Sequence, residues 1–247
     1  MAARVIHEFR GHSGSQVCLM GKRGNLFVRK TGNFQRNLEQ LQTLADFPVP
    51  RVYGHTAAHM DMEYIHGLDM RAYLINNPPE ALSEFILDIV EKFAQQSVAK
   101  DYTEVYQTFL ANTDFDPLPF TQQQLLDHLP STLPQSKYHG DLTLENIIFN
   151  ANQGFYLIDC ATGIWDSYVF DIAKLRQDLT CYWFLRSHPA MLQTKLSLIQ
   201  QQLLSRFTEG KNDALLILML LRVIRYCEPS DTDHVFLIKE IEKLWKS

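Results

Sequence analysis

The first part of the chain alternates short apolar runs with polar turns, which is the pattern of an antiparallel sheet. The expected strands are residues 5–9, 16–20, 25–30, 51–54 and 59–65. The first three are separated by turns rich in Gly and Ser or in Lys and Arg, so we expect them to form a meander. Apolar residues recur at helical spacing over residues 34–45, and Pro48 follows that helix.

Beyond residue 66 the apolar positions take the spacing of helices. Helices are expected at residues 70–75 and 82–96, and residues 147–149 and 155–158 predict a second strand hairpin. The following segments complete the pattern: an irregular stretch at residues 114–134 with one short helix near residues 122–128, then helices beyond residue 170 with breaks at residues 188–189, 209–210 and 228–229. Composition and period therefore predict an α+β chain with a lobe boundary near residue 66.

Composition supports an enzyme-sized globular protein. A chain of 247 residues that is 46% hydrophobic can bury a full core. The formal charge of −5 and the absence of a basic cluster argue against a nucleic-acid partner, because binding to the phosphate backbone depends on gathered Lys and Arg. The most apolar stretch, residues 214–223, is too short to cross a bilayer and is expected to be a buried helix, so no membrane partner is predicted.

Localisation and charge distribution add two expectations. Four widely spaced cysteines without C-x-x-C spacing, and an N-terminus without an apolar leader, favour a reducing compartment, the cytoplasm. Residues 1–65 hold eight Lys and Arg against five Asp and Glu, a charge of +3, which leaves −8 for the remainder. A basic first part suits nucleotide phosphates and an acidic remainder suits a metal or a cationic substrate, although a solvated surface explains the split equally well.

The candidate chemistry lies around the second hairpin. Asp141 follows His139-Gly140, Asn146 stands five residues later, and Asp159 ends the second strand. Phosphoryl transfer needs a carboxylate that orients the attacking hydroxyl and oxygen ligands that hold magnesium against the phosphates. We therefore assign Asp141 as the base and Asn146 and Asp159 as magnesium ligands. His139 is expected to support the loop through hydrogen bonds.

These motifs resemble those of the aminoglycoside phosphotransferase and choline kinase-like family, relatives of the protein kinases. The resemblance covers roughly residues 15–180 and lies in residues 139–146, 157–159 and 171–175, with further similarity at residues 47–52 and 62–67. It implies a two-lobe protein kinase-like fold with a small N-terminal antiparallel sheet lobe and one helix, residues 1–66, which binds the nucleotide. The larger, mainly α-helical C-terminal lobe, residues 67–247, would carry catalysis and the substrate site.

The resemblance also implies ATP or GTP as the phosphoryl donor, Mg²⁺, and a small-molecule hydroxyl as the acceptor. Lys30 matches the strand lysine that binds the α- and β-phosphates. Strand alternation separates it from Arg29, since Lys30 shares a face with Val28 and Arg29 shares the other with Phe27. The helix acid that pairs with this lysine in the family is left open between Glu39 and the position of Asn37.

Further nucleotide contacts are assigned by position. The phosphate-covering loop corresponds to the segment with Ser13, Gly14 and Ser15, and the segment that meets the adenine edge to Glu63, Tyr64 and Ile65. The first segment lacks G-x-G-x-x-G, so an ordinary hairpin turn explains it equally well. Asp171 corresponds to an Asp that supports the catalytic loop in the family, with helix N-capping as the alternative.

The sequence leaves three functions open. The first is an ATP-dependent kinase for a sugar, an amino alcohol or a related polar metabolite; residues 142–145 and 171–178 are similar to family members encoded with surface-polysaccharide biosynthesis proteins. The second is an aminoglycoside or choline kinase proper. Its cationic acceptor would need acidic or aromatic groups such as Asp166, Asp178, Trp183, Glu228 and Asp231. The third is a catalytically silent nucleotide-binding regulatory protein of the same fold. The acceptor and the oligomeric state are not determined by the sequence.

Overall fold

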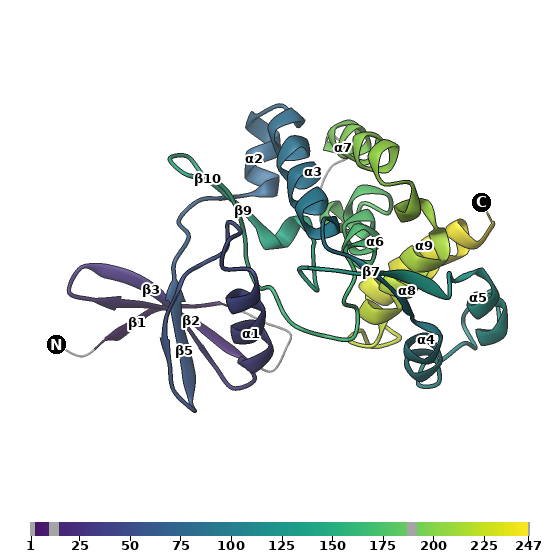
Figure 1. Cartoon of the computed structure of the whole chain (residues 1–247), viewed down its shortest axis with the longest axis horizontal. Coiled ribbons are helices and arrows are strands. Elements are labelled where there is room, and N and C mark those ends of the chain that lie inside the picture. Colours follow the sequence, from purple (N-terminus) through teal and green to yellow (C-terminus); the bar gives the residue numbers. More distant parts are fainter. Residues whose placement is uncertain (1–2, 10–14, 187–191, 247) are drawn as a thin grey trace. The chain divides into compact units, whose positions relative to one another are not determined.

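A computed structural model describes residues 3–9, 15–186 and 192–246 (Figure 1). The chain divides into two compact units. Met1–Asn76 and His139–Gly163 form the first, and Asn77–Tyr138 and Ile164–Ser247 form the second. The first unit therefore contains both the N-terminal sheet and the segment that carries Asp141, Asn146 and Asp159. The functional lobe boundary at residue 66 stays a prediction.

A five-stranded antiparallel sheet forms the N-terminal part of the first unit (Figure 1). The strands are β1 (Arg4–Phe9), β2 (Gln16–Lys22), β3 (Asn25–Thr31), β4 (Val52–His55) and β5 (His59–Glu63). Their order is β1-β2-β3-β5-β4, so the first three make the expected meander and β5 pairs with β3. All five expected strands form, with ends shifted by one or two residues.

One helix accompanies this sheet. The helix α1 (Gln35–Thr43) buries Leu38 and Leu41, and Leu44 follows it with no exposed surface. These are the apolar positions whose spacing predicted the helix. Burial of such side chains contributes about 1.5 to 3 kcal/mol each. The hydrophobic stripe therefore fixes which side of α1 faces inward.

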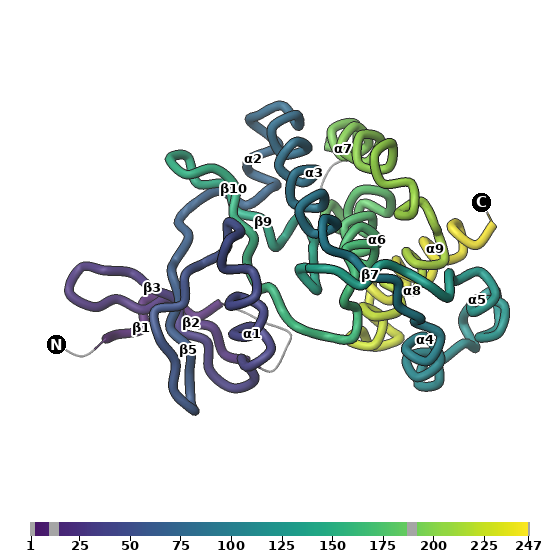
Figure 2. The backbone as a smooth tube through the Cα atoms, viewed as in Figure 1, coloured from purple at the N-terminus to yellow at the C-terminus, as the bar shows by residue number. Residues whose placement is uncertain are grey.

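A second, three-stranded sheet in the first unit contains the hairpin that Asn146 precedes and Asp159 follows. Its strands are β6 (Leu68–Asp69), β9 (Ile147–Asn150) and β10 (Gly154–Leu157), in the order β10-β9-β6. Helix α2 (Met70–Asn76) contributes Tyr73, whose ring centroid lies 4.7 Å from that of Phe149 and 5.1 Å from that of Phe155. This aromatic cluster anchors the β9–β10 hairpin, whose path can be followed in Figure 2.

Gly67 allows the chain to approach β9 closely. A Cβ atom at this position would lie 2.3 Å from the carbonyl oxygen of Phe149 and 2.7 Å from Cγ2 of Ile148. Its φ is not positive, so freedom of backbone conformation is not what requires a glycine here. Close packing against β9 is thus the reason that no side chain fits there, and it lets Leu68 pair with Phe149.

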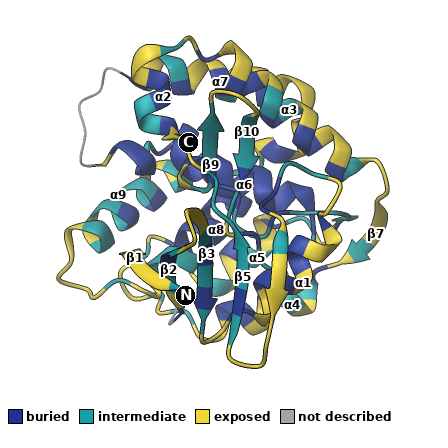
Figure 3. Ribbon diagram, turned by 90° about the vertical axis from the view of Figure 1, so that its left-hand side faces the viewer, coloured by how far each residue is buried: buried dark blue, intermediate teal, exposed yellow. Residues whose placement is uncertain are grey.

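The second unit is mainly helical. Its elements are α3 (Glu80–Ala94), β7 (Val98–Asp101), α4 (Thr103–Leu110), α5 (Gln122–His128), β8 (Thr132–Gln135), α6 (Tyr168–Leu179), α7 (Gln193–Arg206), α8 (Asp213–Ile224) and α9 (Thr232–Lys246), with short 3₁₀ turns at Trp183–Leu185 and Thr208–Lys211. Every residue of α6 is buried, as are eight consecutive residues of α8, and Figure 3 shows both helices largely in the buried colour.

Most of the sequence-predicted helices form. The short helix near residues 122–128 is confirmed as α5, and Thr121 caps it by accepting a hydrogen bond from the backbone N–H of Gln124. Helix α4 and the paired strands β7 and β8 were not expected, because their residues lack a clear apolar period. The expected break at residues 188–189 lies outside the described residues. No helix among the described residues has the length and apolarity to span a membrane.

Candidate active site

The central feature of the first unit is an ion pair between the strand lysine and the hairpin aspartate. Nζ of Lys30 lies 2.7 Å from Oδ1 of Asp159. The lysine side chain is 4% exposed and that of the aspartate 54%, so the charge pair lies at the edge of the protein interior. The ammonium is thus fixed, while the carboxylate remains accessible to solvent and to a ligand.

Asp159 has an unusual backbone conformation. Its φ of +56° is in the left-handed region, which costs a residue with a Cβ atom about 1 to 2 kcal/mol. Two adjacent backbone hydrogen bonds stabilise this turn: Ile158 N–H donates to the carbonyl of Asn146 at 2.9 Å, and Ala161 N–H donates to the carbonyl of His139 at 3.1 Å. Asp159, the candidate metal ligand, therefore lies in a turn after β10 that is hydrogen-bonded to the backbone of His139 and Asn146.

Asn146 braces the loop that carries Asp141. Its amide nitrogen donates to the backbone oxygen of Asp141 at 2.8 Å and lies 3.3 Å from Oδ2 of the same residue. Both contacts use the amide nitrogen, so the amide oxygen takes no part in them. The asparagine thus positions the proposed base and also retains an oxygen for a cation.

His139 connects the two motifs from within the interior. It is fully buried, its Nδ1 accepts a hydrogen bond from the backbone N–H of Asp141 at 3.2 Å, and its carbonyl accepts one from the N–H of Ala161 at 3.1 Å. Burial lowers the pKa of the imidazole, and the opposing attraction of Asp141 and Asp159 is smaller. The ring contacts the loop through its bond from the N–H of Asp141, and Gly140 beside it adopts a φ of +90°, which favours glycine.

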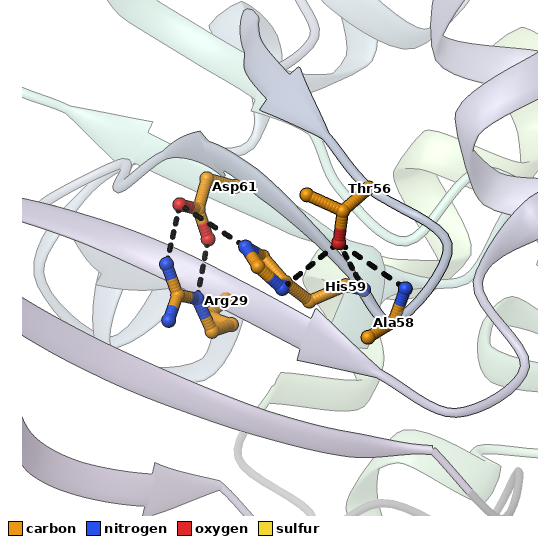
Figure 4. A network of polar contacts seen from close by, with 5 residues as sticks. All are labelled: Arg29, Thr56, Ala58, His59 and Asp61. Atoms are coloured by element: carbon orange, nitrogen blue, oxygen red, sulfur yellow. Dashed lines mark hydrogen bonds and ion pairs between the residues drawn. The ribbon is translucent and has the colours of Figure 1, made fainter.

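Arg29, the neighbour that might be confused with Lys30, belongs to the other face of the sheet. Its guanidinium bonds the two carboxylate oxygens of Asp61 at 2.6 and 2.7 Å, and His59 lies beside them (Figure 4). The register pairs Arg29 with Asp61 and Lys30 with Met60 on successive residues. The alternation that the sequence predicts is therefore present, and it directs only the lysine towards Asp159.

The helix position opposite Lys30 is occupied by an amide. Asn37 on α1 is buried, and its Nδ2 donates to Oδ1 of Asp159 at 3.2 Å and to the carbonyl of Cys160 at 2.7 Å. Glu39 is exposed and accepts a hydrogen bond from the hydroxyl of Thr162 at 3.2 Å. Of the two candidates left open by the sequence, Asn37 is the one that reaches the ion pair.

The candidate nucleotide-binding segments are only partly described. Ser13 and Gly14 lie outside the described residues. Ser15 is buried and its hydroxyl donates to the carbonyl of Asn33 at 2.9 Å, which ties the start of β2 to the turn after β3. Tyr64 and Ile65 follow β5 in partly buried positions.

Glu63, the last residue of β5, is bound within the sheet. Its backbone N–H donates to the carbonyl of Arg51 at 2.8 Å, and its carboxylate pairs with the guanidinium of that arginine at 3.2 Å. The register places it opposite Phe27, on the face that also carries Arg29. Any contact of Glu63 with a nucleotide therefore has to come from its backbone.

In the second unit, Asp171 is buried and Asp166 is held by hydrogen bonds to neighbouring side chains. Asp171 lies within α6 and does not cap it. The N-cap is Ser167, whose hydroxyl accepts a hydrogen bond from the backbone N–H of Val169 at 3.2 Å. Asp166 accepts hydrogen bonds from Lys100, Tyr102 and Gln135. Burial by itself would raise the pKa of Asp166, but these partners lower it below its usual range.

The donor set of the first unit fits magnesium. Among the described residues no group of three or more His, Cys, Asp and Glu side chains gathers as a metal cluster. Mg²⁺ is commonly held by one or two protein oxygens together with substrate phosphates and water, and not by a closed protein cage. The accessible carboxylate of Asp159 and the amide oxygen of Asn146 have this character.

Comparison with solved structures shows the fold. The chain is similar to the choline kinase LicA from Streptococcus pneumoniae, with 14% identity, a TM-score of 0.59, and coverage of 100% of this chain and 94% of the other. It is also similar to a putative fructosamine-3-kinase from Thermobifida fusca, with 17% identity, a TM-score of 0.62, and coverage of 99% of this chain and 94% of the other. A third similar structure is a thermostable mutant of the aminoglycoside phosphotransferase APH(4)-Ia in complex with ADP and hygromycin B. The identity is 10%, the TM-score is 0.66, and the match covers 97% of this chain and 92% of the other.

Sequence comparison shows the family. No curated protein matches the chain. Residues 9–195, which include strands β2 to β5 of the N-terminal sheet and the candidate site residues, match the phosphotransferase enzyme family known as APH. Since this match spans most of the 247 residues, the chain belongs to the APH phosphotransferase enzyme family and has its protein kinase-like fold.

Proposed function

We propose that this protein is an ATP-dependent small-molecule kinase that transfers the γ-phosphoryl group to a hydroxyl of a sugar, an amino alcohol or a similar polar metabolite. The observation that carries the proposal is the 2.7 Å ion pair of Lys30 and Asp159, in the same compact unit as Asp141 and Asn146. Phosphoryl transfer depends mainly on positioning and charge stabilisation, and these four groups supply a cation, a base and two oxygen ligands.

In this proposal Asp141 orients the acceptor. Its carboxylate accepts a hydrogen bond from the acceptor hydroxyl and takes the proton as the hydroxyl oxygen bonds to the γ-phosphorus. The bond between that phosphorus and the β,γ-bridging oxygen breaks, and the nucleoside diphosphate leaves. The contact between Asn146 and the backbone of Asp141 supports this role, because it fixes the loop without using the lone pairs of Oδ1.

The donor side rests on Lys30 and on the end of β5. The buried ammonium is suited to the α- and β-phosphates, and the backbone of Glu63, Tyr64 and Ile65 to the base edge of ATP or GTP. One structural neighbour was solved with ADP, which supports an adenine nucleotide. Asn146 and Asp159 would hold Mg²⁺, which when bound neutralises charge on the transferred phosphates.

The acceptor class is proposed from two observations. Structural neighbours are named for choline, fructosamine and aminoglycoside phosphorylation, all of which involve hydroxyl-bearing polar molecules that also carry nitrogen. The charge of −8 outside residues 1–65 favours an acceptor with a positive group. An aminoglycoside or choline kinase proper is therefore the second candidate, and Asp166 is unsuited to its cation because Lys100 already neutralises it.

Turnover measurements with defined acceptors test the proposal. ATP and GTP are each incubated with Mg²⁺ and with sugars, amino alcohols, choline or aminoglycosides, and nucleoside diphosphate release is compared with acceptor phosphorylation by ³¹P NMR. Acceptor-dependent release that disappears in Asp141→Asn supports the kinase. Binding of MgADP without turnover of any acceptor favours the silent regulatory alternative, which the neutral Asn37 opposite Lys30 keeps open.

A further inference from the structure

The start of helix α1 contacts the segment that follows Asp159, the proposed metal ligand. Thr162 N–H donates to the carbonyl of Arg36 at 3.0 Å, and Nε of Arg36 donates back to the carbonyl of Thr162 at 2.5 Å. One residue further along α1, Asn37 donates to the carbonyl of Cys160 at 2.7 Å. Two consecutive helix residues therefore hold the chain from residue 160 to residue 162.

The chemistry of its partners fixes the orientation of the Asn37 amide. Oδ1 of Asp159 and the carbonyl oxygen of Cys160 accept hydrogen bonds and cannot donate them when the aspartate is ionised. The amide nitrogen, which has two hydrogens, must therefore be the atom that faces both. Asn37 is 8% exposed, so water competes little for these contacts.

The same carboxylate oxygen binds Lys30 and Asn37. Nζ of Lys30 is 2.7 Å from Oδ1 of Asp159, and Nδ2 of Asn37 is 3.2 Å from it. A cation and a neutral donor thus hold one oxygen and determine how the carboxylate is turned. The other oxygen, Oδ2, is the one left to ligate a cation without displacing either donor.

A carboxylate at position 37 would act in the opposite way. It would face two acceptors, repel Asp159 and compete with it for the charge of Lys30. Glu39 does not take that place, because residues two apart on a helix do not share a face. The amide therefore leaves Asp159 as the acidic side chain that the structure pairs with Lys30.

We propose that Asn37 is a positioning residue for Asp159: its side-chain amide, where the family resemblance leads one to expect an acid, fixes the carboxylate and the peptide after it for binding the nucleotide-bound metal. This inference rests on the proposed kinase function. Asn37 also stabilises the backbone turn at Asp159, where φ is +56°, because it donates a hydrogen bond to the carbonyl of Cys160.

Magnesium-dependent nucleotide binding tests the proposal without relying on turnover. ADP affinity is measured by calorimetry over a range of Mg²⁺ concentrations, at a temperature where each variant is folded, for the wild type, Asn37→Asp and Asn37→Ala. Asn37→Asp preserves size but removes the donor, and Asn37→Ala removes the side chain without adding charge. Asn152→Asp in the exposed β9–β10 turn and Glu39→Gln on the exposed side of α1 are matched controls.

We expect the Mg²⁺ midpoint to rise about 10-fold to 100-fold in Asn37→Asp, which is the usual effect of removing a group that orients a metal ligand. Asn37→Ala should show a smaller rise, and ADP affinity without Mg²⁺ should change less than the Mg²⁺ midpoint. Both controls should match the wild type. A purely structural asparagine would lower the melting temperature but leave the midpoint of the folded protein unchanged.

Two results would overturn the inference alone. One is a wild-type Mg²⁺ midpoint in both Asn37 variants. The other is tighter MgADP binding in Asn37→Asp, which would show that position 37 favours an acid that pairs with Lys30. Failure of the wild type itself to bind ADP with Mg²⁺ would instead overturn the proposed kinase function, and with it the need for a positioning residue.

Discussion

Lys30 and Asp159 are 129 residues apart in the sequence, and the ammonium of the one lies 2.7 Å from a carboxylate oxygen of the other. The lysine comes from the third strand of the N-terminal sheet and the aspartate from the turn after β10. Because both belong to one compact unit, the pairing depends on the internal folding of that unit.

Replacing Lys30 by Met should lower kcat/KM for ATP about 10²-fold, because the apolar stem remains but the charge that stabilises the phosphates is lost. Steady-state kinetics with varied ATP measure this effect. Arg29→Met is the matched control, since Arg29 pairs with Asp61 on the opposite face of the sheet and should change kcat/KM by no more than a few-fold. Equal losses in both variants would refute the assignment of Lys30.

Asp141→Asn should lower kcat by about 10² to 10⁴, the usual contribution of a general base, while ADP binding is retained. The loop should remain in place because the 2.8 Å bond from Asn146 is to the backbone oxygen of residue 141 and does not need the carboxylate. Single-turnover kinetics and ADP calorimetry separate the two effects. Substantial turnover in this variant would remove Asp141 as the base.

Asp159→Asn should raise the Mg²⁺ concentration that gives half-maximal activity by at least about 10-fold, because an amide oxygen is a weaker ligand for a hard cation than a carboxylate. Magnesium titrations of activity measure the change. Asp61→Asn provides the same exchange on the other face of the sheet and should leave the titration unaltered. If Asp159→Asn also leaves it unaltered, the metal ligand lies elsewhere.

The pH dependence of stability should carry a contribution from His139. Burial lowers its pKa in the folded protein, so the unfolded chain binds a proton near pH 6.5 that the folded chain does not. This contribution to stability is present above that pH and is lost as the pH falls, by at most about 1.4 kcal/mol per unit. Urea unfolding between pH 7.5 and 5.5 should therefore show a smaller slope for His139→Gln.

The exposed His55 on β4 provides the control for this measurement. His55→Gln is the same exchange at an exposed position, away from the buried loop of His139, and should retain the wild-type slope. Parallel slopes for the wild type and His139→Gln would mean that His139 takes up a proton in the folded state as readily as in the unfolded one.

Gly67→Ala should destabilise the protein by about 1 to 3 kcal/mol, because the new methyl group would collide with the backbone of Phe149 and force β6 away from β9. Chemical denaturation measures the loss. Gly54→Ala on β4 meets no atom within 4 Å and should change stability by less than about 0.5 kcal/mol. Similar values for the two variants would contradict the close approach at Gly67.

Local sequence patterns were sufficient to predict much of the first unit. Alternating apolar residues predicted the five strands, the stripe containing Leu38 and Leu41 predicted α1, and polar residues between two apolar runs predicted the β9–β10 hairpin. These elements are determined by the period at which side chains recur, which is a property of neighbouring residues. Helix α4 and the β7–β8 pair were missed because their formation depends on distant partners, as Val98 pairs with Gln135.

The sequence by itself determined the candidates for the chemistry, since Asp141, Asn146 and Asp159 stand at the spacing that a hairpin brings together. Only the tertiary structure decided what surrounds them. Whether Asn37 or Glu39 reaches Asp159 depends on the rotation of α1 about its axis, which is set by burial of its leucines against the unit. The type of a side chain determines what it can bind. That Asn37 binds Asp159, 122 residues away, is determined only when packing turns one side of α1 inward.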